Sequence, residues 1–175
     1  CIASLEMRPE ETLYRMAKQA AGCHPSPEFV GQFADWTDQR ICIYDQLDTV
    51  QADKILGMIH YAAKELACAH IVVDSLTKVG LSTDDYTLQT SFVDRLQWAA
   101  KTYGCHVHLV CHMRKGSSEH DRPGKFDVRG ASQITDLADN VFVCWKNKAR
   151  EEANRLSQQG MTLSDKESKA LDQCD

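Results

Sequence analysis

Short apolar runs alternate along this chain with longer segments of amphipathic character, and this alternation constrains the fold most. In the segment 49–67, apolar residues recur near a period of 3.6, which indicates a helix with one buried face. Strands that alternate with helices predict βαβ units and a parallel sheet. The strand-like runs are almost continuously apolar, so both faces of the sheet are expected to be covered by helices. The sequence therefore predicts an α/β fold with a mostly parallel sheet.

The predicted elements follow one another without a recognisable linker. Strands are predicted at 1–6, 40–45, 69–76, 105–112 and 140–147. Helices are predicted at 8–22, 25–37, 49–67, 86–104 and 130–139. The remaining segment, 149–175, is polar and predicted to be helical, which divides the chain into a core at 1–148 and a tail. The chain opens directly on a strand-like run without a methionine, so we expect it to begin inside a domain.

Composition narrows the class of protein. A chain of 175 residues with 43% hydrophobic residues suits one domain with a substantial core. No apolar run approaches the roughly 18 residues of a membrane span, and the N-terminus lacks the basic region of a secretory signal. The eight cysteines are therefore predicted to be reduced core residues in a cytoplasmic protein.

The stretch CHVHLVCHMRK, at 105–115, raises the question of a metal site. A strand here would place His106, His108 and His112 on one face. A tetrahedral zinc site needs about four ligands, usually from two elements. The chain contains neither CxxC nor HExxH, so we expect no zinc.

Polar residues lie at or near the end of each predicted strand, and the carboxyl edge of an open α/β sheet is where ligands bind. These residues are Glu6, Asp45, Asp74, His112 and Asn147. The run HIVVDSL, which contains Asp74, has the form of a Walker B strand, in which the aspartate holds Mg²⁺ through water. The alternative is an ordinary helix cap or loop carboxylate.

One loop is basic although the chain carries a net charge of −5. The segment 113–129 has a net charge of +2, so the remainder carries −7. Its basic residues are Arg114, Lys115, Arg122, Lys125 and Arg129. A local basic loop on an acidic body suits one dedicated contact with a polyanion, whereas the alternative is a solvated surface loop.

Four blocks together carry a family resemblance: SLEMRPEETLYRMA, IVVDSL, HLVCHMRK and VRGASQITDLADNVFVCWKNK. In this order they resemble the RecA-like motor domain of DnaB-type replicative helicases, including phage primase-helicases and the mitochondrial Twinkle helicase. The resemblance spans 1–148. It implies a homo-hexameric ring that translocates on single-stranded DNA by hydrolysing ATP or another NTP with Mg²⁺, and that works with a primase or a helicase loader.

The resemblance also implies roles for individual residues. Glu6 would be the base that activates the attacking water, although a carboxylate there could instead stabilise the next helix's N-terminus. Asp74 would hold Mg²⁺ through water, and His112 would sense the γ-phosphate. Lys146 lies where some phage members carry a phosphate-facing arginine, but lysine is a point charge and lacks the paired N–H donors of a guanidinium group.

The resemblance places DNA binding after the sensor histidine. Arg129 and Gly130, in VRGASQ, match the start of the family's DNA-loop motif. Arginine can hold a phosphate with two hydrogen bonds, and glycine lets a backbone approach closely. With the other basic loop residues, Arg114, Lys115, Arg122 and Lys125, they form the predicted DNA-binding set.

The chain departs from the family in lacking a phosphate-binding loop. GxxxxGK[ST] does not occur, and the Gly124–Lys125 pair is followed by phenylalanine. We therefore expect a motor-domain segment that is incomplete at both ends and inactive when isolated. Two alternatives remain: another RecA-like ATPase of the recombinase or DNA-repair type, and a non-catalytic α/β DNA-binding or scaffold domain.

Overall fold

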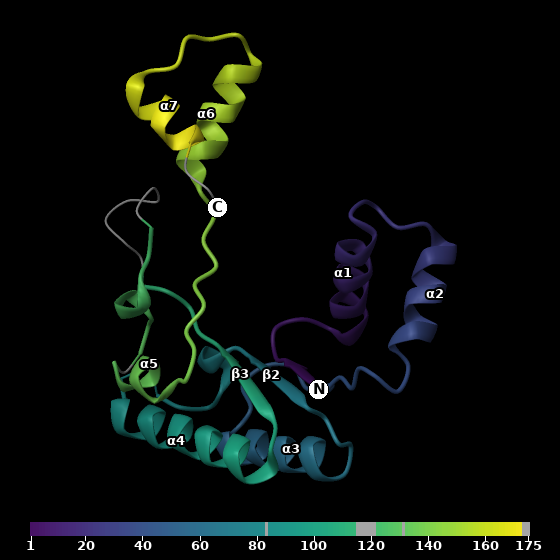
Figure 1. Ribbon diagram of the computed structural model, residues 1–175. Coiled ribbons are helices and arrows are strands. Elements are labelled where there is room, and N and C mark those ends of the chain that lie inside the picture. The colour runs from purple at the N-terminus through teal and green to yellow at the C-terminus, as the bar shows by residue number, and fades with distance from the viewer. Residues whose placement is uncertain (83, 115–121, 131, 173–175) are drawn as a thin grey trace. The chain divides into compact units, whose positions relative to one another are not determined.

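The computed structural model describes residues 1–82, 84–114, 122–130 and 132–172 (Figure 1). The chain divides into two compact units. The first comprises Cys1–His112 and Arg129–Ala138, and the second comprises Met113–Val128 and Asp139–Asp175.

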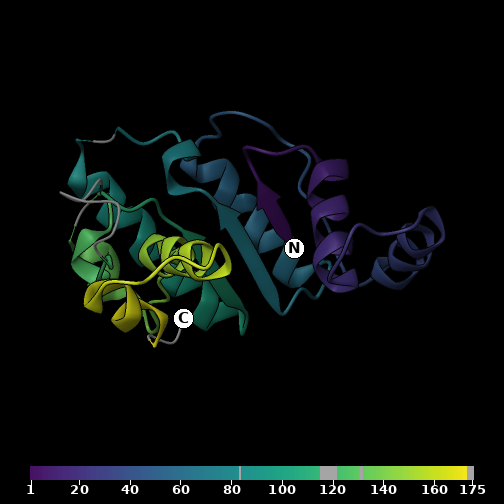
Figure 2. The same cartoon turned by 90° about the horizontal axis from the view of Figure 1, so that it is seen from above.

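A parallel sheet organises the first unit. Its strands are β1 (Ile2–Ser4), β2 (His70–Asp74) and β3 (His106–Val110), in the order β1-β2-β3. Figure 2 shows β1 and β2 side by side and pointing the same way. The pairing aligns Ser4 with Asp74, and Asp74 with Val110, so the three strands end at one edge. The predicted parallel α/β fold is confirmed.

Two predicted strands differ from the structure. In the segment 40–45, pairing is limited to one parallel bridge between Ile43 and Ile2, flanked by two backbone hydrogen bonds. Within the described residues, 140–147 forms no strand, and Phe142 is 84% exposed there. An apolar run favours a strand only where a neighbouring strand offers its backbone groups.

The helices lie close to their predicted positions. They are α1 (Pro9–Ala21), α2 (Pro27–Thr37), α3 (Ala52–Lys64), α4 (Tyr86–Tyr103), α5 (Gln133–Leu137), α6 (Lys148–Gln158) and α7 (Asp165–Leu171), with 3-10 turns at Leu76–Lys78 and Lys125–Asp127. Ser26 caps α2, and Asp85 caps α4 by accepting the Leu88 N–H at 2.9 Å. Gly22 and Gly104 end α1 and α4 in the left-handed conformation.

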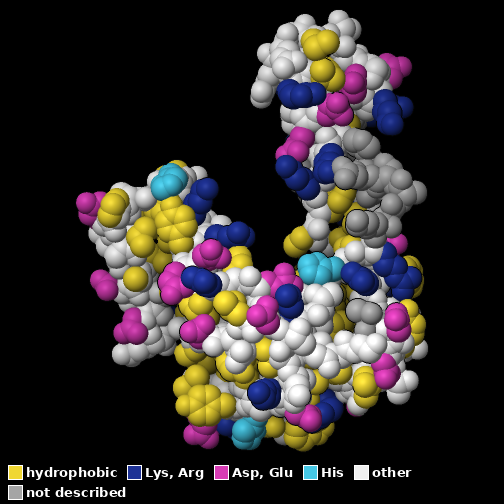
Figure 3. All heavy atoms as spheres, turned by 180° about the vertical axis from the view of Figure 1, so that it is seen from behind, with side chains coloured by type: hydrophobic (Ala, Val, Ile, Leu, Met, Phe, Trp, Pro, Cys, Tyr) yellow, Lys and Arg dark blue, Asp and Glu magenta, His cyan; other side chains and the backbone are white. Residues whose placement is uncertain are grey.

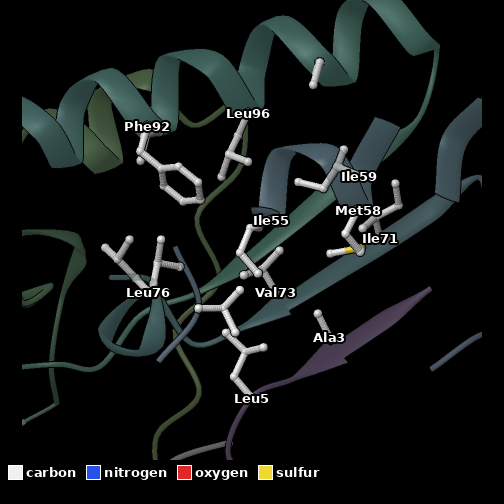
Figure 4. Packing of buried hydrophobic residues seen from close by; sticks show 14 of the residues in the cluster. Ala3, Leu5, Ile55, Met58, Ile59, Ile71, Val73, Leu76, Phe92 and Leu96 are labelled. Carbon is white, nitrogen blue, oxygen red and sulfur yellow. The ribbon is translucent and has the colours of Figure 1, made fainter. Parts of the chain in front are cut away.

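The core lies between the sheet and the helices α3 and α4 (Figure 4). Ile55 and Ile59 of α3 and Phe92 of α4 pack with Ile71 and Val73 of β2. Burying each of these side chains stabilises the fold by about 1.5–3 kcal/mol. A rigid sheet results, and it fixes where its carboxyl edge lies.

Three histidines line the sheet face opposite to Ile71 and Val73. The His106 and His108 rings stack at 4.5 Å, and His70 Nδ1 lies 3.2 Å from His108 Nε2. The prediction that His106 and His108 share a face is confirmed. Across the described residues, no group of three His, Cys, Asp or Glu side chains is placed to hold a metal ion. That zinc is absent from the protein stays a prediction for elemental analysis.

The cysteines are less buried than expected. The seven that fall within the described residues carry free thiols, and Cys23 and Cys144 are exposed. Cys111 is half-buried, and this burial raises the pKa of its thiol to about 11. None of the helices in the described ranges has the length and apolarity to cross a membrane.

Candidate functional site at the carboxyl edge of the sheet

Three of the predicted site residues meet at the carboxyl edge of the sheet. Asp74 is the last residue of β2, while Glu6 and His112 each lie two residues beyond the end of a neighbouring strand. Because the strand ends are aligned, the chains leaving them bring these side chains together. Asp45 is exposed outside this cluster, and Asn147 belongs to the second unit, where it caps α6.

A buried hydroxyl links the cluster. Ser75 Oγ donates to Glu6 Oε1 at 2.9 Å and lies 2.6 Å from Thr77 Oγ1 and 3.4 Å from His112 Nε2. His112 Nε2 lies 3.7 Å from Glu6 Oε1. Ser75 is fully buried, whereas the side chains of Glu6 and His112 are 38% and 53% exposed. The side chains of Glu6 and His112 are therefore accessible to a ligand, while the buried Ser75 hydroxyl contacts both of them.

Sequence reasoning did not select Ser75 or Thr77 as site residues. A signal was present, because a hydroxyl directly follows the aspartate that ends β2 and another follows two residues later. The 3-10 turn at Leu76–Lys78 folds both hydroxyls back under the edge, and the Lys78 N–H donates to the Ser75 carbonyl at 2.9 Å.

The electrostatics of the edge favour a cation. Burial raises the pKa of Asp74, and the nearby Glu6 carboxylate raises it further, while His112 opposes both effects. Two carboxylates in this position repel one another, and a positive ion between them would relieve the repulsion. Carboxylate oxygens suit Mg²⁺, which usually takes one or two protein ligands and completes its shell with water and phosphate oxygens. The residues present thus fit a magnesium ion that a nucleotide brings with it.

A cavity of about 30 Å³ adjoins His112. Its lining includes Thr77, Gln89, His112, Arg129 and Gly130. The Arg129 N–H donates to the His112 carbonyl at 2.8 Å, so these two predicted residues are joined through their backbones. The position predicted to be the sensor and the one predicted to begin the DNA-loop motif are therefore adjacent in the structure.

Gly130 has a packing requirement of its own. Its φ is +123°, and a Cβ would lie 2.7 Å from Gln89 Oε1 and 2.9 Å from Ile134 Cδ1. Only glycine fits this backbone position without strain. The close approach that glycine allows here is to α4 and α5 of the same chain.

The other predicted residues belong to the second unit. Met113 and Val128 form an antiparallel bridge, and the Arg114 N–H donates to the Asp127 carbonyl at 2.6 Å. The side chains of Arg114, Arg122 and Lys125 are exposed, and Lys125 Nζ lies 5.4 Å from the Phe126 ring centroid. Lys115 lies outside the described residues.

Lys146 also lies in the second unit. Its Nζ pairs with Glu151 Oε1 at 3.0 Å, and both side chains are largely exposed. An exposed pair of this kind contributes about 0–1 kcal/mol, so it would not prevent Lys146 from engaging another anion.

The geometry shows a parallel α/β sheet whose carboxyl edge carries two carboxylates, an imidazole and a buried hydroxyl. The sequence profile of a family described as AAA domain matches residues 1–118, and the chain belongs to this family. The matched region contains Glu6, Asp74 and His112 and ends before Arg129, Gly130 and Lys146.

The chain is also similar to the DNA helicase/primase of Enterobacteria phage T3. The two are 25% identical over 138 residues, which cover 71% of this chain and 24% of that protein. The chain therefore spans about a quarter of the length of the relative it matches. Both findings confirm the resemblance to the RecA-like domain of DnaB-type phage helicases.

Proposed function

We propose that this chain is the NTP-hydrolysing motor segment of a replicative DNA helicase. The observation that carries the proposal is the meeting of Glu6, Asp74 and His112 at one edge of a parallel sheet. All three lie within the stretch that matches the AAA domain family. The name of the phage T3 relative, a DNA helicase/primase, supports DNA as the substrate.

The chemistry follows from the three side chains. Glu6, partly exposed and held by Ser75, orients and deprotonates the water that attacks the γ-phosphate. Asp74 would hold Mg²⁺ through water, and the ion would supply positive charge to offset that of the phosphates. His112 senses the γ-phosphate and passes on its presence to the residues that are hydrogen-bonded to it. Lys146 offers a further positive charge to the nucleotide.

The phosphate cradle is the part this chain does not supply. Gly124 N–H donates to Asp127 Oδ2 at 2.7 Å at the start of a single 3-10 turn, so the Gly124–Lys125 pair serves a local turn. Without a P-loop, backbone N–H groups and a lysine for the β- and γ-phosphates are missing. We therefore propose that the isolated chain does not turn over nucleotide and that the full-length protein does.

The DNA-binding part of the proposal rests on the basic loop. In the full-length protein, which we propose is a homo-hexameric ring, this loop lines the central channel and follows the phosphates of single-stranded DNA. The residues engaged are Arg114, Lys115, Arg122, Lys125, Arg129 and Gly130. Acidic and basic side chains are interspersed over the face drawn in Figure 3, which fits local contact with DNA better than general adsorption. The setting is the cytoplasm of a bacterial or phage-infected cell, with a primase or helicase loader as partner.

The proposal is tested by hydrolysis assays on the full-length protein that contains this chain. With Mg²⁺ and single-stranded DNA, Asp74→Asn should lower turnover by about 10²-fold or more, because the metal loses its carboxylate. Asp94→Asn, exposed on α4, is the matched control and should hydrolyse normally. A strand-displacement assay on duplex DNA would distinguish a helicase from a recombinase-type ATPase. Absence of DNA-stimulated hydrolysis in the wild-type protein would favour the non-catalytic scaffold instead.

A further inference from the structure

We propose that Ser75 is a positioning residue that holds the base Glu6 and fixes the proton of His112 on Nε2. The effect of Ser75 on catalysis, which is one part of this inference, rests on the proposed function. Its structural content concerns only the three side chains, so it can be examined in the isolated chain.

The hydrogen-bonding capacity of one hydroxyl leads to this assignment. Ser75 has a single proton and two lone pairs, whereas an ionised carboxylate only accepts. The proton of Ser75 is therefore given to Glu6 Oε1, 2.9 Å away. Thr77 Oγ1, at 2.6 Å, and His112 Nε2, at 3.4 Å, must then act as donors to Ser75. In this arrangement the neutral His112 carries its proton on Nε2.

Burial makes the arrangement specific. Ser75 is 0% exposed, so solvent does not replace its hydroxyl. Of its partners, Glu6 and His112 are partly exposed, and each would otherwise be satisfied by water on the open side of the edge. The hydroxyl therefore decides which oxygen of Glu6 and which nitrogen of His112 face inward.

The turn that follows Ser75 does not use this hydroxyl. The 3-10 turn that follows Ser75 is closed by backbone hydrogen bonds, and the Ser75 side chain does not cap it. Residues Glu6 and His112 are 69 and 37 positions away along the chain, so the side chain joins the ends of β1 and β3 to the end of β2.

A first experiment observes His112 directly by nitrogen NMR of the imidazoles in the isolated chain. The His112 signals are assigned by their loss in His112→Gln. The wild-type chain at neutral pH should show His112 with its proton on Nε2, and Ser75→Ala should move the proton population toward Nδ1. Ser4→Ala is the matched control, because Ser4 Oγ at the same edge is buried and, within the described residues, makes no hydrogen bond. It should leave the His112 signals unchanged.

Two results would overturn the proposal. One is a wild-type His112 with its proton on Nδ1, a result that does not depend on the Ser75→Ala chain. The other is a Ser75→Ala chain that melts cooperatively and keeps the wild-type imidazole signals.

A second experiment examines catalysis in the full-length protein. Ser75→Ala should lower kcat for DNA-stimulated hydrolysis by about tenfold, the loss expected for one hydrogen bond to a charged group. The KM for nucleotide should stay unchanged, since Ser75 is not exposed to the ligand. If KM rises while kcat holds, Ser75 shapes the nucleotide site and the proposal fails. If Glu6 proves dispensable for hydrolysis, the proposed function fails while the NMR result still decides the role of Ser75.

Discussion

His112 and Arg129 are joined by a backbone hydrogen bond, in which the Arg129 N–H donates to the His112 carbonyl at 2.8 Å. This bond closes the base of the basic loop, so the loop leaves and returns at adjacent points of the first unit. In the proposed motor, nucleotide state at His112 and DNA contact at Arg129 are coupled through this hydrogen bond.

The coupling predicts opposite defects for two substitutions in the full-length protein, neither of which removes the backbone bond. Arg129→Ala should weaken binding to single-stranded DNA of every sequence and lower the salt dependence of log K by about 0.7, the value for one lost phosphate contact. His112→Ala should keep DNA affinity but lose DNA-stimulated hydrolysis. Oligonucleotide titrations at several salt concentrations, with hydrolysis assays in parallel, measure both.

The control for this pair is Lys101→Ala, an exposed cation near the end of α4. It should change neither the salt dependence nor the stimulation. If Arg129→Ala behaves as Lys101→Ala does, the basic loop is a solvated surface and has no role in DNA binding.

Asp74 should make the chain less stable as pH rises. Burial and Glu6 raise the pKa of Asp74 in the folded chain above its unfolded value. The folded state then binds the proton more tightly, so stability falls as pH rises from the unfolded to the folded pKa. Asp74→Asn should therefore raise Tm at neutral pH, and this gain should shrink as pH falls below the unfolded pKa. Thermal melts of the isolated chain across pH 3 to 7 measure the effect.

The same melts on Asp94→Asn supply the comparison. An exposed aspartate of α4 should give a Tm close to that of the unchanged chain throughout the range. A destabilised Asp74→Asn chain at neutral pH would mean that the Asp74 carboxylate makes a favourable contact that outweighs its burial.

Gly130→Ala should destabilise the first unit. The φ of +123° is strained for any residue with a Cβ, and the added atom would meet Gln89 and Ile134 below 3.0 Å. The expected loss is about 1–3 kcal/mol, measured by urea unfolding of the isolated chain.

Gly57→Ala is the internal comparison for that measurement. Gly57 lies within α3, and nothing lies within 4 Å of the Cβ position. Alanine there should stabilise the chain by about 0.5–1 kcal/mol through helix propensity. Equal effects of the two substitutions would show that Gly130 is not confined as described.

The edge of the sheet was predictable because it depends on local patterns. An apolar run that ends in Asp74 marks both the strand and where it stops, and parallel strands place such ends together. The hydrogen bonds of Ser75 were not predictable from the sequence. They join Ser75 to Glu6, 69 positions away, and to His112, 37 positions away, and no sequence pattern encodes the shape of the turn that allows this. The prediction of a strand at 140–147 was wrong for a similar reason, because its apolar residues indicate a strand but do not indicate a neighbouring strand to pair with.

Glu6→Gln in the full-length protein tests the central claim most directly. The amide keeps the shape of the side chain and still accepts the Ser75 hydrogen bond, but it cannot take a proton from water. We predict nucleotide affinity within about twofold of wild type and turnover reduced by about 10²–10⁴-fold, with Glu10→Gln on the first turn of α1 hydrolysing normally. Wild-type turnover by Glu6→Gln would contradict the account.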